Sequence, residues 1–200
     1  MKLTSFAATV MLLAAGVGSA QAARYPTARV SFDDFKELVA EVETHRASRL
    51  IDLDTFLRMS KEEGAVILDS RSDFRFDRIH IKGARHLAFT DFTQDNLAKV
   101  IPGPDTRILI YCNNNFDGNP TDFATKAFVP GPKPPRAAAG QLAVQEKPRM
   151  LALNIPTYVN LYGYGYRNVY ELHELVRVSD PRIEFQGSIV GQKPMPPVLK

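Results

Sequence analysis

The sequence has little of several features that usually identify a function directly. It has one cysteine in 200 residues, so no disulfide can form within the chain and the fold depends on its apolar core. The formal net charge is only +3, and no basic stripe is interleaved with aromatic side chains, which argues against nucleic-acid binding. His45, His86 and His173 are dispersed without the spacing of a metal site, so we expect neither a metal nor another cofactor.

Long apolar runs are also absent after Val17, and the one run before it is short for a membrane span. Lys2 precedes this run, Phe6–Val17, and Ala20-Gln21-Ala22 follows it with the small-x-small pattern of a cleavage site. We therefore expect a signal peptide over residues 1–22 and a periplasmic or secreted mature protein, without stable membrane insertion. An uncleaved membrane anchor is the alternative.

What the sequence does have is enough apolar residues for a core, and short runs of them predict strands. Hydrophobic residues make up 44% of the chain, against 24% charged, which is ordinary for a globular protein. Unalternating apolar runs of this length are typical of strands buried on both faces. The predicted strands are residues 49–52, 65–68, 84–89, 107–111 and 168–172.

Helices are predicted between these strands. Apolar residues recur at helical spacing from Phe32 to Val42. Asp54 is the expected cap of a short helix that Gly64 ends, and Asn154 the expected cap of a later one. Further helical segments are expected at residues 73–78 and 91–100.

Strands that alternate with helices indicate an α/β fold with a five-stranded, mostly parallel sheet and helices on both faces. We expect a helical extension at residues 23–48 and the main domain at 49–186. A Pro-rich insertion at about 129–149 interrupts that domain, and a loose tail at 187–200 follows it. In such sheets ligands bind just outside the carboxyl ends of strands, where Asp69 and Cys112 fall.

Four segments, in order along the chain, resemble those of rhodanese-like domains. They are Asp69-Ser70-Arg71, His80-Ile81-Lys82-Gly83-Ala84, Ile110-Tyr111-Cys112, and Gly165-Tyr166-Arg167-Asn168-Val169-Tyr170. The resemblance implies a small α/β domain and sulfur transfer. In such a reaction the cysteine accepts a sulfane sulfur as a persulfide and passes it to a thiol or to cyanide.

Independent chemistry also favours Cys112 as the nucleophile. The thiolate is the reactive form, and a tight loop between a strand and a helix start can surround it with backbone N–H groups. The same donors would hold a persulfide anion. The structural alternative is a buried, inert thiol at a strand end.

The loop after Cys112 is predicted to bind substrate, but it departs from the family pattern. It consists of Asn113, Asn114, Asn115, Phe116, Asp117, Gly118 and Asn119. Sulfurtransferases of this family usually carry a basic residue late in the loop, and this loop has none. A carboxylate near the thiol would disfavour the thiolate and repel thiosulfate, so we expect a neutral or protein-bound donor to be preferred. The arginine of a Cys-x5-Arg phosphatase loop is replaced by Gly118, which argues against phosphatase activity.

Asp69, Arg71 and His80 are interpreted as structural supports of the site. Asp69 is expected to bond to loop backbone, and Arg71 to pair with an acid at the strand end. His80 precedes a glycine turn, where a satisfied structural histidine is the simpler interpretation.

Three functional hypotheses remain. The first is a sulfurtransferase with Cys112 as nucleophile, whose partners are a sulfane-sulfur donor and a thiol acceptor that can be a protein. The second is a catalytically weak or inactive module that binds a protein partner through the polar loop and the Pro-rich insertion. The third is a redox role through sulfenic acid or a mixed disulfide, which needs a partner thiol because the chain has no second cysteine.

Overall fold

The computed structural model describes residues 25–124 and 151–191. The chain divides into two compact units, residues 1–31 and 32–200. Of the first unit, residues 25–31 are described, and they form no helix or strand. The expected signal peptide, the Pro-rich insertion at 129–149 and the end of the tail lie outside the described residues.

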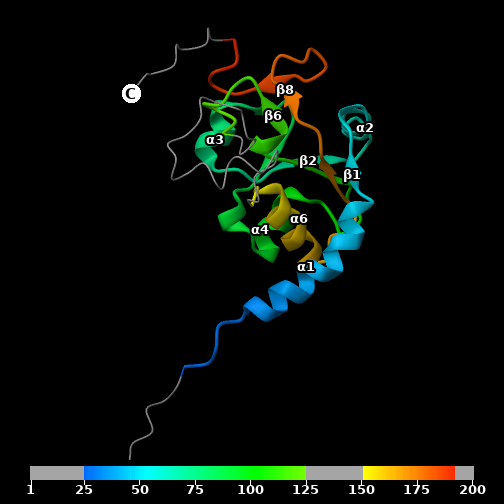
Figure 1. The fold of residues 1–200 in the computed structure, drawn as a ribbon, viewed down its shortest axis with the longest axis vertical. Coiled ribbons are helices and arrows are strands. Elements are labelled where there is room, and N and C mark those ends of the chain that lie inside the picture. Colours follow the sequence, from blue (N-terminus) through cyan, green and yellow to red (C-terminus); the bar gives the residue numbers. More distant parts are fainter. Residues whose placement is uncertain (1–24, 125–150, 192–200) are drawn as a thin grey trace, which may run out of the picture. The chain divides into compact units, whose positions relative to one another are not determined.

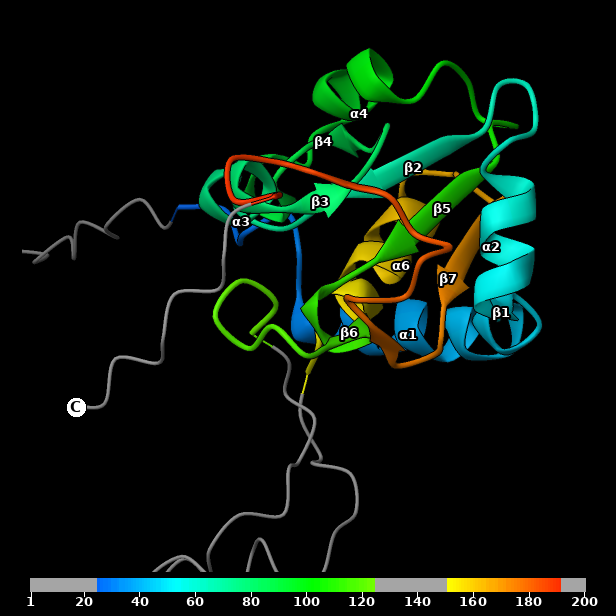
Figure 2. The same ribbon diagram turned by 90° about the horizontal axis from the view of Figure 1, so that it is seen from above.

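The second unit contains a five-stranded parallel sheet with the order β1-β7-β5-β2-β4 (Figures 1 and 2). All four neighbouring pairs are parallel. The predicted α/β fold with five strands is confirmed, and each predicted run supplies one strand. Their bounds are Leu50–Ile51 (β1), Val66–Asp69 (β2), Arg85–His86 (β4), Ile108–Tyr111 (β5) and Val169–Leu172 (β7).

Two small strand pairs in the described part of the chain were not predicted. β3 (His80–Ile81) pairs antiparallel with β9 (Phe185–Gln186), and β6 (Phe116–Asp117) pairs parallel with β8 (Val176–Arg177). Each strand has two residues, which is too short to give an apolar periodicity in the sequence.

Helices cover both faces of the sheet, as predicted. Figure 1 places α2 and α3 on one side and α1, α4 and α6 on the other. Their bounds are Phe32–Ala47 (α1), Leu53–Met59 (α2), Asp73–Arg78 (α3), Gln94–Val100 (α4) and Asn154–Gly163 (α6). Short 3-10 turns lie at Phe89–Asp91 (η1) and Asn113–Asn115 (η2).

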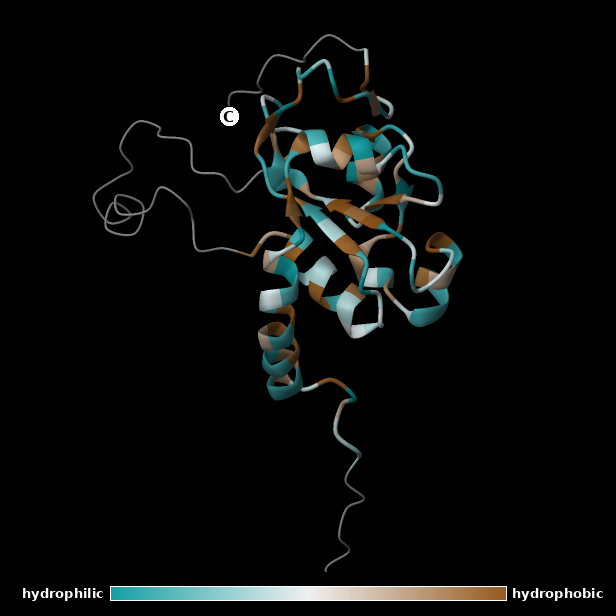
Figure 3. Cartoon of the chain, turned by 90° about the vertical axis from the view of Figure 1, so that its right-hand side faces the viewer, coloured by the Kyte–Doolittle hydropathy of each residue, from teal (hydrophilic) through white to brown (hydrophobic). Residues whose placement is uncertain are grey.

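The sheet separates two apolar layers. Ile108 and Ile110 of β5 pack into the layer that contains the buried residues of α1, α4 and α6. Leu109 and Tyr111 pack into the layer on the α2 side. All four β5 residues are fully buried, which explains why the strand is apolar without alternation. Figure 3 shows the apolar strands lying between more hydrophilic outer helix surfaces.

Several predicted boundaries were wrong by a few residues. Asp52, not Asp54, caps α2, and its side chain accepts a hydrogen bond from the backbone N–H of Thr55 at 2.8 Å. The predicted strand at 84–89 is shorter, because Phe89 begins the turn η1. The helix predicted at 91–100 begins later, at Gln94. Asn154 is the first residue of α6 rather than its cap, and its side chain donates instead to the Glu171 carboxylate.

Helix α1 was predicted as an extension, and it lies in the same compact unit as the sheet. Val42 is buried in the core, and the guanidinium of Arg46 donates two hydrogen bonds, of 2.6 and 2.5 Å, to the carboxylate of Glu171 in β7. Phe32 is exposed at the start of the helix. No helix in the described ranges has the length and apolar character needed to cross a membrane.

Candidate active site

Cys112 follows the last residue of β5, at the carboxyl end of the central strand. The register pairs Tyr111 with Asp69, the last residue of β2, so the ends of the two strands lie side by side. Cys112 is 5% exposed. The sheet therefore brings together Asp69 and the cysteine, which are distant in the sequence.

Behind the cysteine lies a buried ion pair between Asp69 and Arg71. The Arg71 Nε lies 3.0 and 3.1 Å from the two carboxylate oxygens of Asp69, and Nη2 lies 2.6 Å from Oδ2. Asp69 Oδ1 also accepts the backbone N–H of Arg71 at 2.9 Å. Both side chains are almost completely buried, at 0% and 1% exposure. A buried pair of this kind needs every donor satisfied, because an unpaired charge there would be costly.

The remaining donors of Arg71 reach two other segments. Nη2 donates to the carbonyl oxygen of Ile79 at 2.6 Å, and Nη1 donates to Asn113 Oδ1 at 3.1 Å. The guanidinium also lies over the Phe123 ring, 4.8 Å from its centroid. Arg71 thus connects the end of β2, the end of α3 and the cysteine loop.

The electrostatics of this cluster keep Arg71 charged and Tyr111 protonated. Burial opposes the charge of Arg71, but its hydrogen bonds to Asp69 and the nearby negative charge outweigh burial and raise its pKa. Burial and the neighbouring carboxylate of Asp69 raise the pKa of Tyr111 well above its usual range. The Tyr111 hydroxyl donates to Asp69 Oδ2 at 2.5 Å and accepts the Ile81 N–H at 3.1 Å. Arg71 therefore stays positively charged and Tyr111 stays neutral within this cluster.

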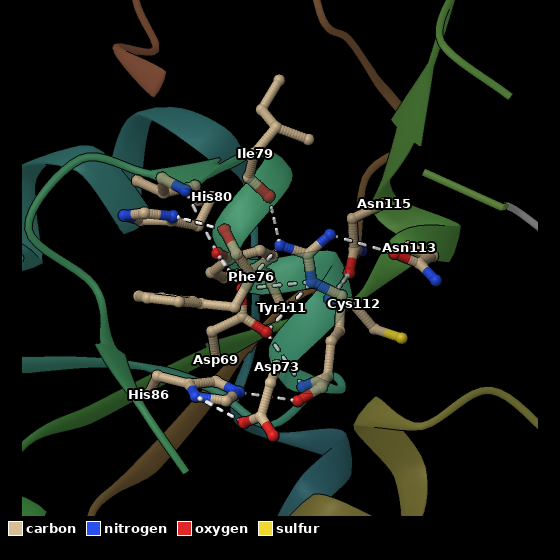
Figure 4. Close-up of polar contacts among 12 residues, drawn as sticks. Asp69, Asp73, Phe76, Ile79, His80, His86, Tyr111, Cys112, Asn113 and Asn115 are labelled. Atoms are coloured by element: carbon tan, nitrogen blue, oxygen red, sulfur yellow. Dashed lines mark hydrogen bonds and ion pairs between the residues drawn. The ribbon is translucent and has the colours of Figure 1, made fainter. Parts of the chain in front are cut away.

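His80 lies beside this cluster rather than against the cysteine (Figure 4). Its Nδ1 is 2.7 Å from the carbonyl oxygen of Phe76, and its ring stacks on the Phe76 ring at 3.8 Å. His86 stacks on Phe76 as well, with its ring centroid 4.4 Å away, and its Nε2 lies 2.8 Å from the carbonyl oxygen of Arg71. These contacts fix the segment between β2 and β3.

The loop residues after Cys112 are not one binding surface. Asn113 and Asn114 line a pocket with Cys112. Asn115 is buried: its Oδ1 accepts the Cys112 N–H at 2.8 Å, and its Nδ2 donates to the Leu172 and Glu174 carbonyl oxygens at 2.7 and 3.2 Å. Phe116 is fully buried in the core.

The later loop residues turn away from the described lining of this pocket. Asp117 is exposed, and its side chain accepts the Gly118 N–H at 2.8 Å. Gly118 has a φ of 91°, which favours glycine at that position. The Asn119 side chain is hydrogen-bonded to Asp122, donating from Nδ2 at 3.0 Å and accepting the backbone N–H at 3.2 Å. Of the seven loop residues predicted to bind substrate, the structure brings two to the pocket.

The pocket beside Cys112 has a volume of about 320 Å³, and sequence reasoning missed one of its main side chains. Arg75 of α3 belongs to its lining, which also includes Arg71. Within the described ranges Arg75 is bonded to no carboxylate, but its charge acts on the nearby Asp122, and it donates to the Thr121 carbonyl oxygen. The described residues that line the pocket are Arg71, Ser72, Arg75, Cys112, Asn113, Asn114, Ala124, Ala152 and Leu153.

A larger pocket, of about 610 Å³, lies between Leu53 and the segment from Glu174 to Arg182. It contains no cysteine, and one of its two arginines, Arg182, is already paired with Asp180 and Asp54. The smaller pocket is therefore the chemically relevant one. Among the described residues no group of three potential ligands could hold a metal ion.

The sequence matches the rhodanese-like domain family over residues 52–173, more than half of the chain. The chain belongs to the rhodanese-like domain family. The match includes β2, β5, β7 and Cys112. Among curated proteins none matches.

One solved structure similar to this rhodanese-like chain is the BH2092 protein from Bacillus halodurans. It is 18% identical in sequence, with a TM-score of 0.30. The similar region covers 44% of this chain and 65% of that one, so the chain spans less than two thirds of the length of BH2092.

Proposed function

We propose that this rhodanese-like protein is a sulfurtransferase or sulfur carrier that forms a persulfide on Cys112. The observation that carries the proposal is that Cys112 lines a pocket to which Arg71 and Arg75 also belong. A thiolate is the nucleophile in such chemistry, and positive side chains at the pocket attract an anionic donor. In this family, the cysteine at the end of the central strand is the expected sulfur acceptor.

The proposed reaction balances with a thiosulfate-type donor. The Cys112 thiolate attacks the outer sulfur, a new S–S bond forms on the protein, and the old S–S bonding pair leaves with sulfite. A thiolate acceptor then attacks the outer sulfur of the persulfide and regenerates Cys112. No external oxidant or reductant is needed, because the sulfane sulfur moves with its oxidation state unchanged.

We propose a different donor from the neutral or protein-bound one that the sequence favours. The sequence disfavours thiosulfate because it predicts Asp117 near the thiol and has no basic residue in the loop. Asp117 lies in β6 and is not part of the described pocket lining, whereas Arg75 is. We therefore propose a small anionic donor. The 5% exposure of Cys112 also favours a small reactant over a folded protein at this step.

Intact mass spectrometry after incubation with thiosulfate and with a neutral sulfane-sulfur donor tests the proposal. We expect a reducible gain of one sulfur, about 32 Da, that Cys112→Ser abolishes. Arg75→Gln should slow the reaction with thiosulfate about tenfold, as expected for a lost charged contact. Arg58→Gln, on the exposed side of α2, is the matched control. A folded protein with an alkylatable thiol and no gain from any donor would sink the proposal.

We also propose that the protein acts in the periplasm or outside the cell, on the strength of the signal-peptide pattern at residues 1–22. Protein purified from a bacterial periplasmic extract should begin at Ala23. An N-terminal sequence that still begins at Met1, on protein in the membrane fraction, would instead indicate an uncleaved anchor.

A further inference from the structure

The side-chain amide of Asn113 is held in one orientation. Its Oδ1 lies 3.1 Å from Arg71 Nη1. A guanidinium has only donors, so the amide oxygen is the atom that must face it. The amide nitrogen then lies on the opposite side of the group. Figure 4 shows the oxygen of Asn113 at the end of the dashed contact and the nitrogen pointing away from it.

The guanidinium that sets this orientation is itself fixed. Arg71 is 1% exposed and is bound by both carboxylate oxygens of Asp69 and by the Ile79 carbonyl oxygen. A rotation of the amide would place an N–H group against the Arg71 N–H groups and lose the hydrogen bond. The buried pair therefore leaves the two Nδ2 hydrogens of Asn113 directed away from itself.

Those hydrogens belong to a residue that lines the pocket with Cys112. Among the described residues, Asn113 Nδ2 is neither a buried unsatisfied atom nor a donor to another group. The two following amides differ from it. Within the described ranges Asn114 Oδ1 is buried without a hydrogen-bond partner, and the Asn115 amide is hydrogen-bonded to backbone groups. Within the described part of the chain, Asn113 alone of the three combines an amide fixed by Arg71 with an amide nitrogen that donates to no other group.

We propose that Asn113 Nδ2 binds an oxygen of the anionic sulfur donor, and thereby takes part of the role of the loop cation that this chain lacks. The proposal rests on the sulfur-transfer function and names the ligand class of the site as a sulfonate- or thiosulfonate-type anion. Asp69 and Arg71 act as positioning residues, because they set which end of the amide faces the ligand. Arg75 supplies the net charge, and Asn113 supplies a directed neutral donor.

The selectivity of Cys112 for a negatively charged alkylating reagent measures this interaction without sulfur transfer. Iodoacetate and iodoacetamide react with the same thiolate, so the ratio of their rate constants cancels the thiolate fraction and reports on anion recognition. Asn113→Leu, similar in shape but without a donor, should lower the iodoacetate-to-iodoacetamide ratio about tenfold. Asn119→Leu, which removes an amide from the same loop outside the pocket, should leave the ratio within about twofold of the wild-type value.

Asn113→Asp is a second variant that guards against a folding defect. Because its carboxylate also adds a negative charge, Asn113→Leu carries the test of the N–H group. The carboxylate keeps an acceptor for Arg71 and replaces the N–H group by an oxygen. Its fold should therefore persist, and its ratio should fall at least as far as that of Asn113→Leu. A thermal melt on each variant confirms that it is folded.

Two results would overturn the proposal: an unchanged ratio in both Asn113 variants while Arg75→Gln lowers it, or an equal fall in Asn119→Leu. The first would assign anion recognition to the cation alone, and the second would indicate a general effect of the loop. Failure of the sulfur-transfer function can be distinguished from failure of the anion site. If no donor forms a persulfide while Asn113→Leu still lowers the ratio, the sulfur-transfer function falls and the anion site stands.

Discussion

Three consecutive asparagines in this site have three different structural uses. Asn113 is oriented by Arg71, Asn114 lines the pocket, and Asn115 is buried in backbone hydrogen bonds. The residue type is the same, so composition alone could not separate them. What distinguishes them is the position of each within η2 and the partners that β7 and Arg71 provide.

Asn115 is the residue on which the position of the cysteine loop most depends. Asn115→Ala would leave the Cys112 N–H and the Leu172 carbonyl oxygen without their partner inside the protein. We expect a loss of about 2–4 kcal/mol in the free energy of unfolding, measured by urea denaturation. Asn119→Ala, which removes a partly buried amide later in the loop, is the comparison and should lose less. Equal losses in the two variants would contradict this role.

The Asp69–Arg71 pair is the basis of a second prediction about single residues. Asp69→Asn keeps the shape of the side chain but leaves the buried guanidinium unpaired, which should cost about 3–5 kcal/mol of stability. Lys82→Ala removes the exposed Lys82–Glu184 ion pair and should shift the urea midpoint little. If Asp69→Asn proved as mild as Lys82→Ala, the pair would not be the anchor of the strand ends.

Sequence patterns predicted the position of Cys112 and its proximity to Asp69, because both follow buried apolar strands. They did not predict Arg75. No periodicity shows which face of a six-residue helix meets the cysteine, and Arg75 and Arg78 of α3 are indistinguishable by sequence. The structure gives them different partners, since Arg78 pairs with Asp122 while Arg75 lines the pocket.

At the scale of elements, the strands were predictable and the helix ends were not. A run such as Ile108–Tyr111 is buried on both faces, so all of its residues are apolar and the run is recognisable in the sequence. The start of α2 depends on a single side chain, and Asp52 and Asp54 are both suitable caps. Asn154 was unusable as a cap because its amide is bound to Glu171, a residue contributed by another element.

The docking of α1 should depend on pH through His45. Its Nδ1 lies 2.9 Å from the Tyr158 hydroxyl of α6. Burial, with the positive charges of Arg49 and Arg167, lowers the pKa of His45 below its ordinary 6.5. The unfolded chain therefore binds the proton more tightly, and stability should fall as the pH drops through about 6.5 until His45 is protonated in both states.

Urea midpoints measured at pH 7.5, 6.5 and 5.5 check this dependence. His45→Gln should flatten the change over this range, because the substituted residue has no proton to bind. The carboxylates with lowered pKa values contribute only at more acidic pH; Arg182, for example, lowers the pKa of Asp180 to about 2. A pH dependence identical in wild type and His45→Gln would assign it to other groups.

At the scale of the whole molecule, the sheet divides the protein into two cores that share only the strands. Ile101 packs on the α4 side and Ile183 on the other side. Because each face of the sheet has its own apolar layer, residues from the N-terminal and the C-terminal parts of the described chain are both needed to cover it. The arrangement also implies that a substitution that disturbs packing in one layer should have little effect on packing in the other.

Conservative substitutions test this independence without unfolding the protein. Ile101→Val and Ile183→Val should each cost about 1 kcal/mol in the free energy of unfolding. The double variant should equal the sum of the two within about 0.5 kcal/mol. A coupling much larger than that in a urea titration would show that the sheet transmits packing changes between its faces.

The placement of Arg75 on α3 has a consequence for how relatives of this chain are recognised. The nucleophile and the positive charge come from separate segments, one after β5 and one after β2. In the proposed function, the cation that the loop lacks is supplied by a helix encoded well upstream. A screen that discards chains for lacking a basic loop residue would discard this one, whereas one that inspects the position four residues after Arg71 would retain it.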